Sequence, residues 1–285
     1  MSVPTHDETT TAESGWRRFW NRGGWWRALL ATAVYLAIFI GVSYAATSVF
    51  APFIDMKNFF ESPSTIFFSL ALPILIMGVL TLLFVLSLGW QKEIFGRQSP
   101  RGGWWMWIAV ALVIIPIALR AVATNWSGYT VHVVLTLLFL GLSIGFAEEL
   151  ITRGVAVNIL RRGGHSERVV FVLSSALFAL IHSANIIGGQ SPLVVVTTVV
   201  YAFGFGAMMW LSMKVTGSII WAMLLHAATD PTTILATGGI DAHGNTAGDP
   251  TLLAIGGLFN IAYIAFALLA ILLVKGRARE KRIAS

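Results

Sequence analysis

The chain has 285 residues, of which 56% are hydrophobic and only 11% are charged. Soluble globular proteins carry about 25% charged residues, so this composition excludes a conventional soluble enzyme. The chain has no cysteine, which excludes disulfides, thiolate catalysis and cysteine-ligated zinc. The formal net charge is +6, but the basic residues lie in short segments beside apolar runs, as topology signals do. Nucleic acid is therefore not an expected partner.

Long apolar segments recur along the chain and predict an all-α polytopic integral membrane protein. The segments lack the strict alternation of barrel strands, and a helix of about 20 residues crosses a bilayer. A spanning helix also satisfies its own backbone hydrogen bonds in lipid. We predict a bundle of about eight transmembrane helices, near residues 28–50, 65–89, 104–123, 131–159, 168–187, 193–213, 217–238 and 251–274.

The predicted spans divide the chain into four parts. Residues 1–27 form a cytoplasmic N-terminal tail, in which the polar residues 1–15 are expected to be disordered. Residues 28–125 hold three transmembrane helices, and residues 126–240 form the core that carries the polar motifs described below. Residues 241–285 comprise an external loop, the last transmembrane helix and a basic cytoplasmic tail.

Positive charge alternates from one loop to the next. It is concentrated in the N-terminal flank, in the second, fourth and sixth loops and in the C-terminal tail. Cytoplasmic loops carry an excess of Lys and Arg, so we expect both termini in the cytoplasm and the protein in the plasma membrane. Arg120, near the outer end of the third span, is the one cationic exception, and its long side chain could reach the interface.

Two smaller patterns concern packing and anchoring. Gly141 and Gly145 are four residues apart in the fourth span, a spacing that permits the close approach of another helix. The pattern Arg-Gly-Gly-Trp-Trp occurs at residues 22–26 and again at 101–105, each time before a helix that leaves the cytoplasmic face. Arginine at the headgroups and tryptophan in the aromatic belt predict an interfacial anchor at both places.

Three charged residues occur together in the otherwise apolar fourth span: Glu148, Glu149 and Arg153. Charges at membrane depth are costly, so they generally have a partner or a function there. Glu149 and Arg153 are four residues apart, share a helix face and can neutralise each other. Glu148 is rotated by about 100° and has no cation within one turn. It is a candidate general base, and a structural protonated carboxyl group is the alternative.

The fifth and seventh spans each add a histidine. The fifth contains Phe178, His182 and Asn185, with His182 and Asn185 near one face. In the seventh, His226 and Asp230 are four residues apart and can hydrogen-bond directly. Asp230 could then fix the tautomer of His226, or both could point at one ligand. A lone histidine on an apolar helix is usually a satisfied core residue, but here two accompany the acids of the fourth span.

The candidate groups are expected to meet near the middle of the membrane. Glu148, His182 and His226 lie about 20, 21 and 18 Å, at the rise of a helix, from the basic residues that mark the cytoplasmic ends of their spans. Three side chains that start from one face therefore reach a similar depth. The sequence predicts one polar site assembled from three spans.

At these residues the chain resembles the CPBP family of intramembrane proteases, which includes the type II CAAX prenyl endopeptidases and the bacterial Abi, or bacteriocin-immunity-like, proteins. The matching residues are Glu148, Glu149 and Arg153 for the motif EExxxR, Phe178 and His182 for FxxxH, and His226 and Asp230 for a histidine followed four residues later by Asn or Asp. The prenyl proteases usually have Asn at the last position. Asp230 departs from that pattern, which puts a prenylated substrate in particular in doubt.

The resemblance implies an endopeptidase that cuts hydrophobic or membrane-anchored peptides and proteins in or near the lipid bilayer, with residues 126–240 as its catalytic core. Glu148 would activate the attacking water with help from His182. His226 and Asp230 would stabilise the oxyanion. The supporting residues would be Glu149, Arg153, Phe178 and Asn185.

The resemblance leaves open whether a metal takes part. Glu148, His182 and His226 would be the ligands of such a metal, because one carboxylate and two imidazoles suit zinc. The HExxH signature of soluble zinc proteases is absent. We therefore expect a metal-free mechanism based on glutamate and histidine.

Two other classes of function compete with the protease. A non-catalytic scaffold or bacteriocin-immunity-type protein could bind a partner through the same polar site, and the sequence separates it poorly from an enzyme. A proton-coupled transporter also uses acids and histidines within the membrane. We find no clear inverted repeat and no matched pair of broken spans, which argues against a transporter.

Overall fold

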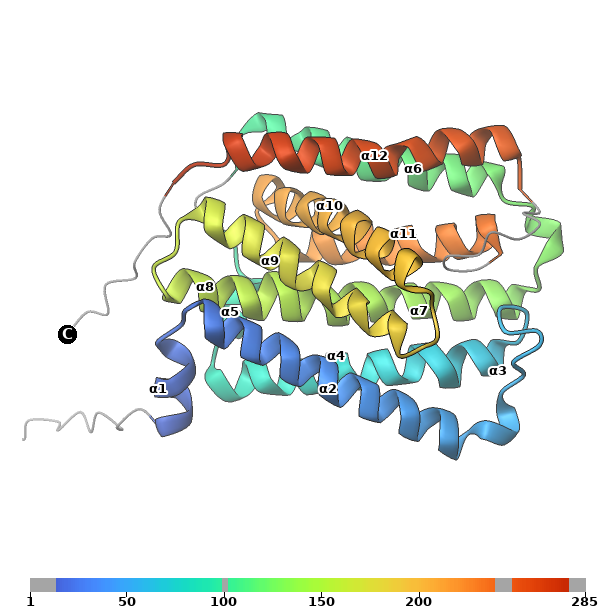
Figure 1. Cartoon of the computed structure of the whole chain (residues 1–285), viewed down its shortest axis with the longest axis horizontal. Helices are drawn as coiled ribbons and strands as arrows, with labels where there is room; N and C mark the ends of the chain where they lie inside the picture. Colours follow the sequence, from blue (N-terminus) through green and yellow to red (C-terminus); the bar gives the residue numbers. More distant parts are fainter. Residues whose placement is uncertain (1–13, 99–101, 239–247, 277–285) are drawn as a thin grey trace, which may run out of the picture.

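The computed structural model describes residues 14–98, 102–238 and 248–276, and within these ranges the chain is helical with no strands. Eight helical segments are long and apolar enough to cross a membrane (Figure 1). They are Trp25–Val49, Pro63–Leu88, Trp104–Ala123, Val131–Arg162, Glu167–Ile186, Pro192–Thr216, Ile219–Thr237 and Pro250–Leu273. The prediction of an all-α, multi-pass integral membrane protein is therefore confirmed. Every predicted boundary lies within three residues of the observed one.

The long segments are divided into shorter elements by local changes of helix type. In chain order the elements are α1 (Gly15–Asn21), α2 (Trp25–Val49), η1 (Ala51–Phe53), α3 (Pro63–Ile66), η2 (Phe67–Ala71), α4 (Leu72–Leu88), α5 (Gln91–Phe95), η3 (Trp104–Met106), α6 (Trp107–Ala123), η4 (Trp126–Gly128), α7 (Val131–Glu149), η5 (Leu150–Ala156), α8 (Val157–Arg162), α9 (Glu167–Ile181), η6 (His182–Ile186), α10 (Pro192–Thr216), α11 (Ile219–Thr237) and α12 (Pro250–Leu273).

The first helix, α1, lies within the predicted N-terminal tail and was not expected. The Ser14 side chain accepts a hydrogen bond from the Arg17 amide and so caps its first turn. Trp16 and Trp20 project from it and pack edge-to-face, as does Phe84 from α4 against both of them. The disorder predicted for residues 1–15 is therefore wrong at its end, and residues 1–13 lie outside the described residues.

Polar residues mark the ends of the helices that carry the predicted motifs. Thr130, Ser166 and Ser191 each accept a hydrogen bond from the amide three residues later, which caps α7, α9 and α10. Gly217 and Gly238 end α10 and α11 in the left-handed conformation, which favours glycine. These local signals limit the helices to lengths that match the membrane.

Close packing of α7 against α11 brings two of the predicted motifs together. A Cβ atom on Gly145 would lie 2.3 Å from the Met223 carbonyl oxygen, and one on Gly141 would lie 2.3 Å from that of Ala227. Any larger residue at either position would separate the two helices. The prediction that these glycines permit close helix packing is confirmed.

The fourth span changes helix type at its charged residues. After Glu149 the α-helix gives way to the π-helical segment η5, which contains Arg153 and is buried throughout. A π-helical turn holds an additional residue and often occurs at functional sites. The pattern of apolar residues contains no signal for this change.

The bundle places the motif-bearing helices between two outer pairs. In Figure 1, α2 and α4 lie together on one side, α6 and α12 lie together on the opposite side, and α7, α9, α10 and α11 lie between them. The close contacts of α2 with α4 and of α12 with α6 agree with this view. Both outer pairs can therefore contribute to a site in the centre.

The two Arg-Gly-Gly-Trp-Trp segments also bind the ends of central helices. The Gly24 amide donates to the Ile159 carbonyl oxygen near the end of α8, at 3.0 Å, and the Gly102 amide donates to the Lys214 carbonyl oxygen near the end of α10, at 2.9 Å. Trp25 and Trp104 are 58% and 82% exposed, as an interfacial anchor requires. Arg101 lies outside the described residues.

Candidate functional site

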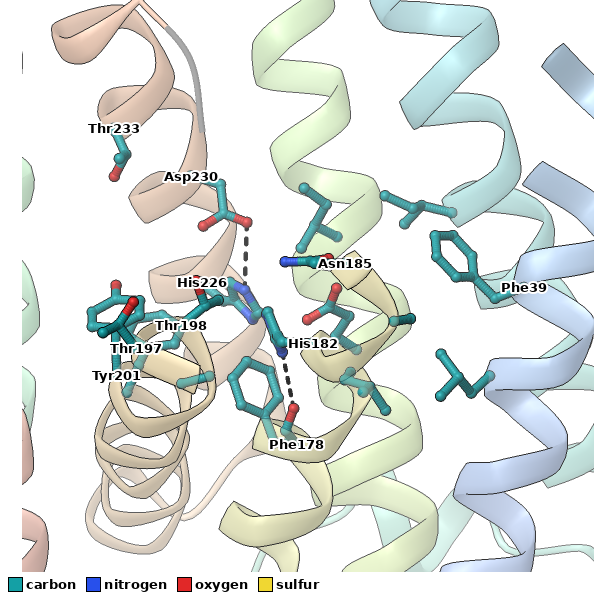
Figure 2. Close-up of a pocket in the computed structure, with 18 of the residues that line it drawn as sticks. Phe39, Phe178, His182, Asn185, Thr197, Thr198, Tyr201, His226, Asp230 and Thr233 are labelled. Carbon is teal, nitrogen blue, oxygen red and sulfur yellow. Dashed lines mark hydrogen bonds and ion pairs between the residues drawn. The ribbon is translucent and has the colours of Figure 1, made fainter. Parts of the chain in front are cut away.

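A cavity of about 450 Å³ lies in the centre of the bundle. The four residues predicted to be catalytic all line it, together with two of the predicted supporting residues: Glu148, His182, His226, Asp230, Phe178 and Asn185. Figure 2 shows His182, Asn185, His226 and Asp230 around one space. The structure thus brings together the groups that the sequence assigned to three separate spans.

Glu149 and Arg153 lie behind the cavity wall and form a buried ion pair. The Arg153 Nε atom is 3.3 Å from Glu149 Oε2, and its Nη1 atom donates to Glu149 Oε1 at 3.3 Å. Both side chains are fully buried. The predicted pairing across one helical turn is therefore observed, with part of the turn in η5.

Three further groups surround the Arg153 guanidinium. Its Nη1 atom donates to Thr152 Oγ1 and its Nη2 atom to the Gly206 carbonyl oxygen, both at 2.6 Å. Its central carbon lies 4.4 Å from the centre of the Phe178 ring, a favourable cation–π distance. Arg153 therefore connects the fourth span to α9 and α10. Thr152 and Gly206 were not predicted. The contact at Gly206 uses its backbone carbonyl oxygen, and the residue type does not show which backbone groups accept a hydrogen bond.

His226 is held between two carboxylates. Its Nδ1 atom is 2.9 Å from Glu149 Oε1, and its Nε2 atom is 3.5 Å from Asp230 Oδ2. Asp230 was one candidate for fixing the His226 tautomer, but Glu149 makes the shorter contact. Only the doubly protonated imidazolium can donate from both nitrogens at once. We call Glu149, Arg153 and His226 the paired cluster.

His182 is oriented by a backbone group of its own helix. Its Nδ1 atom lies 3.0 Å from the Phe178 carbonyl oxygen. A carbonyl oxygen can only accept, so Nδ1 carries a proton, and in the neutral form of the ring Nε2 is then an acceptor. The Phe178 ring lies 5.0 Å from the His182 ring and 5.6 Å from the His226 ring. Phe178 therefore supports both histidines.

Glu148 differs from its neighbour Glu149. Its side chain lines the cavity, and its Oε2 atom is buried without a hydrogen-bond partner among the described residues. Electrostatic interactions reach it from His182, His226 and Asp230. Both histidines thus lie near Glu148 on other helices, but neither forms an ion pair with it among the described residues. Such a carboxyl group is free to bind water or substrate.

Arg120 does not extend to the membrane interface. Its side chain is only 7% exposed and lines the same cavity from α6, so the expectation that it reaches the interface is wrong. The span around it is apolar on every side, so the sequence could not tell which way the arginine faces.

The acidic and histidine side chains of this arrangement do not form a set of metal ligands. No group of three or more His, Asp or Glu side chains within the described ranges is placed so that it could hold a metal ion. His226 has its two nitrogens directed at Glu149 and Asp230, which leaves it poorly placed as a ligand beside Glu148 and His182. The geometry of these residues does not fit the zinc site considered from the sequence.

The predicted site residues lie in a part of the chain whose sequence matches a known protein family. Residues 130–232 match the family of Type II CAAX prenyl endopeptidase Rce1-like proteins. The family resemblance drawn from three short motifs is thereby confirmed. A search of curated proteins finds no match to the chain.

The Rce1-like region contains only part of the cavity wall. It runs from the cap of α7 into α11 and includes all eight predicted site residues. The remaining wall comes from outside it, with Tyr35, Leu36 and Phe39 on α2, Ile74 on α4, Arg120 on α6, Thr233 on α11 and Asn260 on α12. These contributors carry no motif, and the sequence did not indicate them.

Proposed function

We propose that the protein is an intramembrane endopeptidase that hydrolyses peptide bonds in hydrophobic or membrane-anchored peptides and proteins. The Rce1-like match of residues 130–232 supports a protease. The observation that carries the proposal is the unpartnered Glu148 carboxyl group, which shares a membrane-embedded cavity with His182 and His226. A carboxylate, a neutral imidazole and a second, hydrogen-bonded imidazole are the groups that general acid–base hydrolysis needs.

In the first step, Glu148 takes a proton from a water molecule in the cavity. The Nε2 atom of His182 accepts a hydrogen bond from the other O–H group of that water and so orients it. The water oxygen then attacks the carbonyl carbon of the scissile bond and forms the new C–O bond. This assignment agrees with the environment of each group, because Glu148 has a free oxygen and His182 has a free acceptor.

In the same step, negative charge develops on the carbonyl oxygen. His226 supplies the positive charge and the Nε2 proton that stabilise this oxyanion, because its Nδ1 atom is already bound by Glu149. The contact from Nε2 to Asp230 is long, at 3.5 Å, so a substrate oxygen can compete for the proton. Asn185 lines the cavity beside these groups and offers an amide donor.

The tetrahedral intermediate collapses when the C–N bond breaks. Glu148 returns its proton to the departing nitrogen, which leaves as a neutral amine. The carbonyl carbon retains the water oxygen as a carboxyl group. Atoms and charges balance with water as the only other reactant, and no step requires a metal.

Within the paired cluster, Glu149 and Arg153 position the reacting groups without touching the substrate. Arg153 fixes Glu149, Glu149 fixes the Nδ1 side of His226, and the Phe178 ring contacts Arg153 and both histidines. These links join α7, η5, α9 and α11. Glu148, His226 and Asp230 lie on α7 and α11, and His182 follows α9 directly as the first residue of η6. The cluster therefore accounts for three of the predicted supporting residues: Glu149, Arg153 and Phe178.

The character of the cavity wall supports a hydrophobic substrate. On the side of α2 and α4 the wall is formed by Leu36, Phe39 and Ile74 with Tyr35. Apolar and aromatic linings with a few polar groups are typical of sites that bury a ligand. A CAAX-like sequence fits this description, and Asp230 in place of the usual Asn is the feature that separates this chain from the prenyl proteases.

We also propose a plasma-membrane location with both termini in the cytoplasm. The alternation of basic residues between successive loops supports it. Arg161, Arg162 and Lys275 lie at the ends of spans on the side that this topology makes cytoplasmic. Fusion of a reporter to each terminus, read separately in intact and permeabilised cells, tests the orientation.

The decisive experiment compares the wild type with Glu148→Gln in detergent. Both purified proteins are incubated with a mixed library of hydrophobic and prenylated CAAX-like peptides, and the products are identified by mass spectrometry. Exposed Glu61 provides the control variant Glu61→Gln, which removes a carboxylate outside the cavity. We expect cleavage by the wild type and by Glu61→Gln, and a loss of about 10²–10⁴-fold in Glu148→Gln.

Two outcomes would count against the proposal. Equal cleavage by Glu148→Gln would exclude Glu148 as the base, and loss of activity in a chelator would require a metal that the present geometry does not hold. No cleavage by any folded protein would favour the non-catalytic scaffold, and capture of a bound partner would then follow.

A further inference from the structure

A second, smaller pocket lies away from the candidate site, at one end of the bundle. Its volume is about 180 Å³, and it lies between the start of the third span, the ends of α10 and α12 and the first residue of α9. In Figure 1 the start of α9 and the end of α12 both lie at the left of the bundle. The proposed topology makes this the cytoplasmic side, so the pocket lies at the level of the lipid headgroups.

The lining of this pocket combines charged groups with aromatic and aliphatic side chains. Lys214, near the end of α10, is only 3% exposed, whereas Lys275, just beyond α12, is exposed. The other described side chains of the lining are Trp105, Met106, Glu167, Trp210, Leu273 and Val274. The proposed reaction uses none of them.

Glu167, the acidic residue of the described lining, is already neutralised. Its Oε1 and Oε2 atoms accept from Arg161 Nε and Nη2 at 2.8 and 3.0 Å. Lys214 Nζ lies 2.9 Å from the same Oε2 atom. The three cations Arg161, Lys214 and Lys275, set against one carboxylate, leave this group with a net charge of +2.

Hydrogen-bond donors remain available in the pocket. Trp210 is fully buried and lines the pocket, yet its Nε1 atom has no hydrogen-bond partner among the described residues. Lys214 lies one turn further along α10, with Nζ 5.5 Å from the centre of the Trp210 ring. An ammonium group has three N–H donors, and one of them is bound to Glu167. Both groups can only donate, so a fitting ligand brings acceptor oxygens and negative charge.

The size and level of the pocket decide which anion fits. Sites for drug-sized ligands measure roughly 300–1,000 Å³, and this pocket is smaller, so it suits a headgroup better than a peptide. Leu273 in the lining is 43% exposed and offers an apolar surface beside the cations. Basic pockets between transmembrane helices on the cytoplasmic side bind the headgroups of anionic lipids.

We propose that this pocket binds the phosphate group of an anionic phospholipid from the cytoplasmic leaflet. The phosphate oxygens accept hydrogen bonds from Trp210 Nε1 and Lys214 Nζ, Lys275 adds a second cation, and an acyl chain lies along Leu273. The lipid connects α10 with the end of α12 and so stabilises this end of the bundle. A free phosphate ion offers the same chemistry without the acyl chains, and the test separates the two sources.

The test measures lipid binding to the full-length wild type in detergent. Phosphatidylglycerol and phosphatidylcholine with the same acyl chains are added separately, and native mass spectrometry counts the bound lipids while thermal unfolding reports their effect. We expect phosphatidylglycerol to bind about fivefold or more tightly, because choline brings a positive charge towards two lysines. Equal binding of the two lipids would overturn the proposal. Displacement of phosphatidylglycerol by an equal concentration of inorganic phosphate would assign the pocket to a free anion and overturn the lipid assignment.

Variants of the pocket show whether its residues are responsible. Lys275→Gln removes an exposed cation and should weaken phosphatidylglycerol binding about fivefold. Trp210→Phe keeps an aromatic ring but removes the N–H donor to a charged group, and it should weaken binding about tenfold. The matched control is Lys92→Gln, which removes an exposed cation on α5, outside the pocket, and should bind like the wild type.

Two results with the variants would contradict the phospholipid site. Wild-type affinity in Lys275→Gln would exclude Lys275 from the site, and this variant decides alone if Trp210→Phe does not fold. An equal loss in Lys92→Gln and Lys275→Gln would reduce the effect to a general attraction between basic loops and anionic lipid. Binding is measured without a peptide substrate, so failure of the proposed peptidase would leave this result unchanged.

Discussion

Two sets of charged groups share the interior of this bundle, and they differ in whether they have partners. In the paired cluster, Glu149, Arg153 and His226 are joined by ion pairs and hydrogen bonds of 2.9 to 3.3 Å. Glu148 and Arg120 line the cavity, and each keeps a buried polar atom that makes neither a hydrogen bond nor an ion pair within the described residues. The pair of Glu149 and Arg153 holds helices in place, and the unpaired groups are available for water and substrate.

The comparison explains why neighbouring residues of one motif have different roles. Glu148 and Glu149 are adjacent, yet a rotation of about 100° turns one into the cavity and the other towards Arg153. A carboxylate that is paired with a cation is a poor base but a good support, because the cation stabilises its negative charge. A carboxylate with a free oxygen can accept a proton. The following predictions test this division.

The largest effect is expected when the paired cluster loses its cation. Arg153→Ala removes the partner of Glu149 and leaves a buried carboxylate, so it should lower the stability by about 3–5 kcal/mol and reduce accumulation in the membrane. Thermal unfolding in detergent and the yield after purification measure it. The control is Arg162→Ala, which breaks a partly exposed ion pair to Glu93 and should cost at most about 1 kcal/mol. A fully stable Arg153→Ala protein would contradict the structural role of the pair.

A smaller loss is expected from separating α7 and α11, which carry Glu149 and His226 of the paired cluster. Gly145→Ala places a methyl group 2.3 Å from the Met223 carbonyl oxygen, so α7 and α11 must move apart and carry Glu149 away from His226. Overpacking of this kind costs about 1–3 kcal/mol, and cleavage should fall with it. Gly41→Ala is the matched control, because no atom lies within 4 Å of its added carbon. Equal stability and activity of the two variants would argue against tight packing at Gly145.

The fold could be predicted closely because hydropathy and charge act directly on each span. All eight spans were found, and the glycines of α7 indicated close packing of another helix, which the structure identifies as α11. The short helix α1 was missed, since it lies in a polar stretch and contains too few residues to show a period. The π-helical segment η5 was also missed, because its residues are as apolar as those of an ordinary helix.

The site could be predicted in its members but not in all its contacts. Charged residues in apolar segments identified Glu148, His182, His226 and Asp230 as cavity residues. The bond from Glu149 to His226 joins residues 77 positions apart, and spacing along one helix cannot reveal it. Arg120 faces inward on a span without a polar side, so its direction depends on packing against α12.

The third prediction contrasts the two carboxylates that flank His226. Asp230→Asn should reduce cleavage by less than about tenfold, because Glu149 still holds His226 Nδ1 at 2.9 Å and an amide can occupy the longer contact. Glu149→Gln should reduce cleavage more, since it weakens the short bond and leaves Arg153 without its counter-ion. Steady-state kinetics on one peptide compare the two. A complete loss in Asp230→Asn would show that the negative charge of Asp230 is required.

The smallest expected effect concerns the stability of the ligand-free protein when the unpaired arginine is removed. Arg120→Gln leaves no counter-ion behind, because none of the described residues pairs with Arg120, so the stability should stay within about 1 kcal/mol of the wild type or rise. Arg153→Gln, the same substitution in the paired cluster, should be clearly destabilising. Thermal unfolding of both variants in one detergent compares them directly. A large loss of stability in ligand-free Arg120→Gln would mean that Arg120 belongs with the paired groups, and the division between supporting and available charges would fail at that residue.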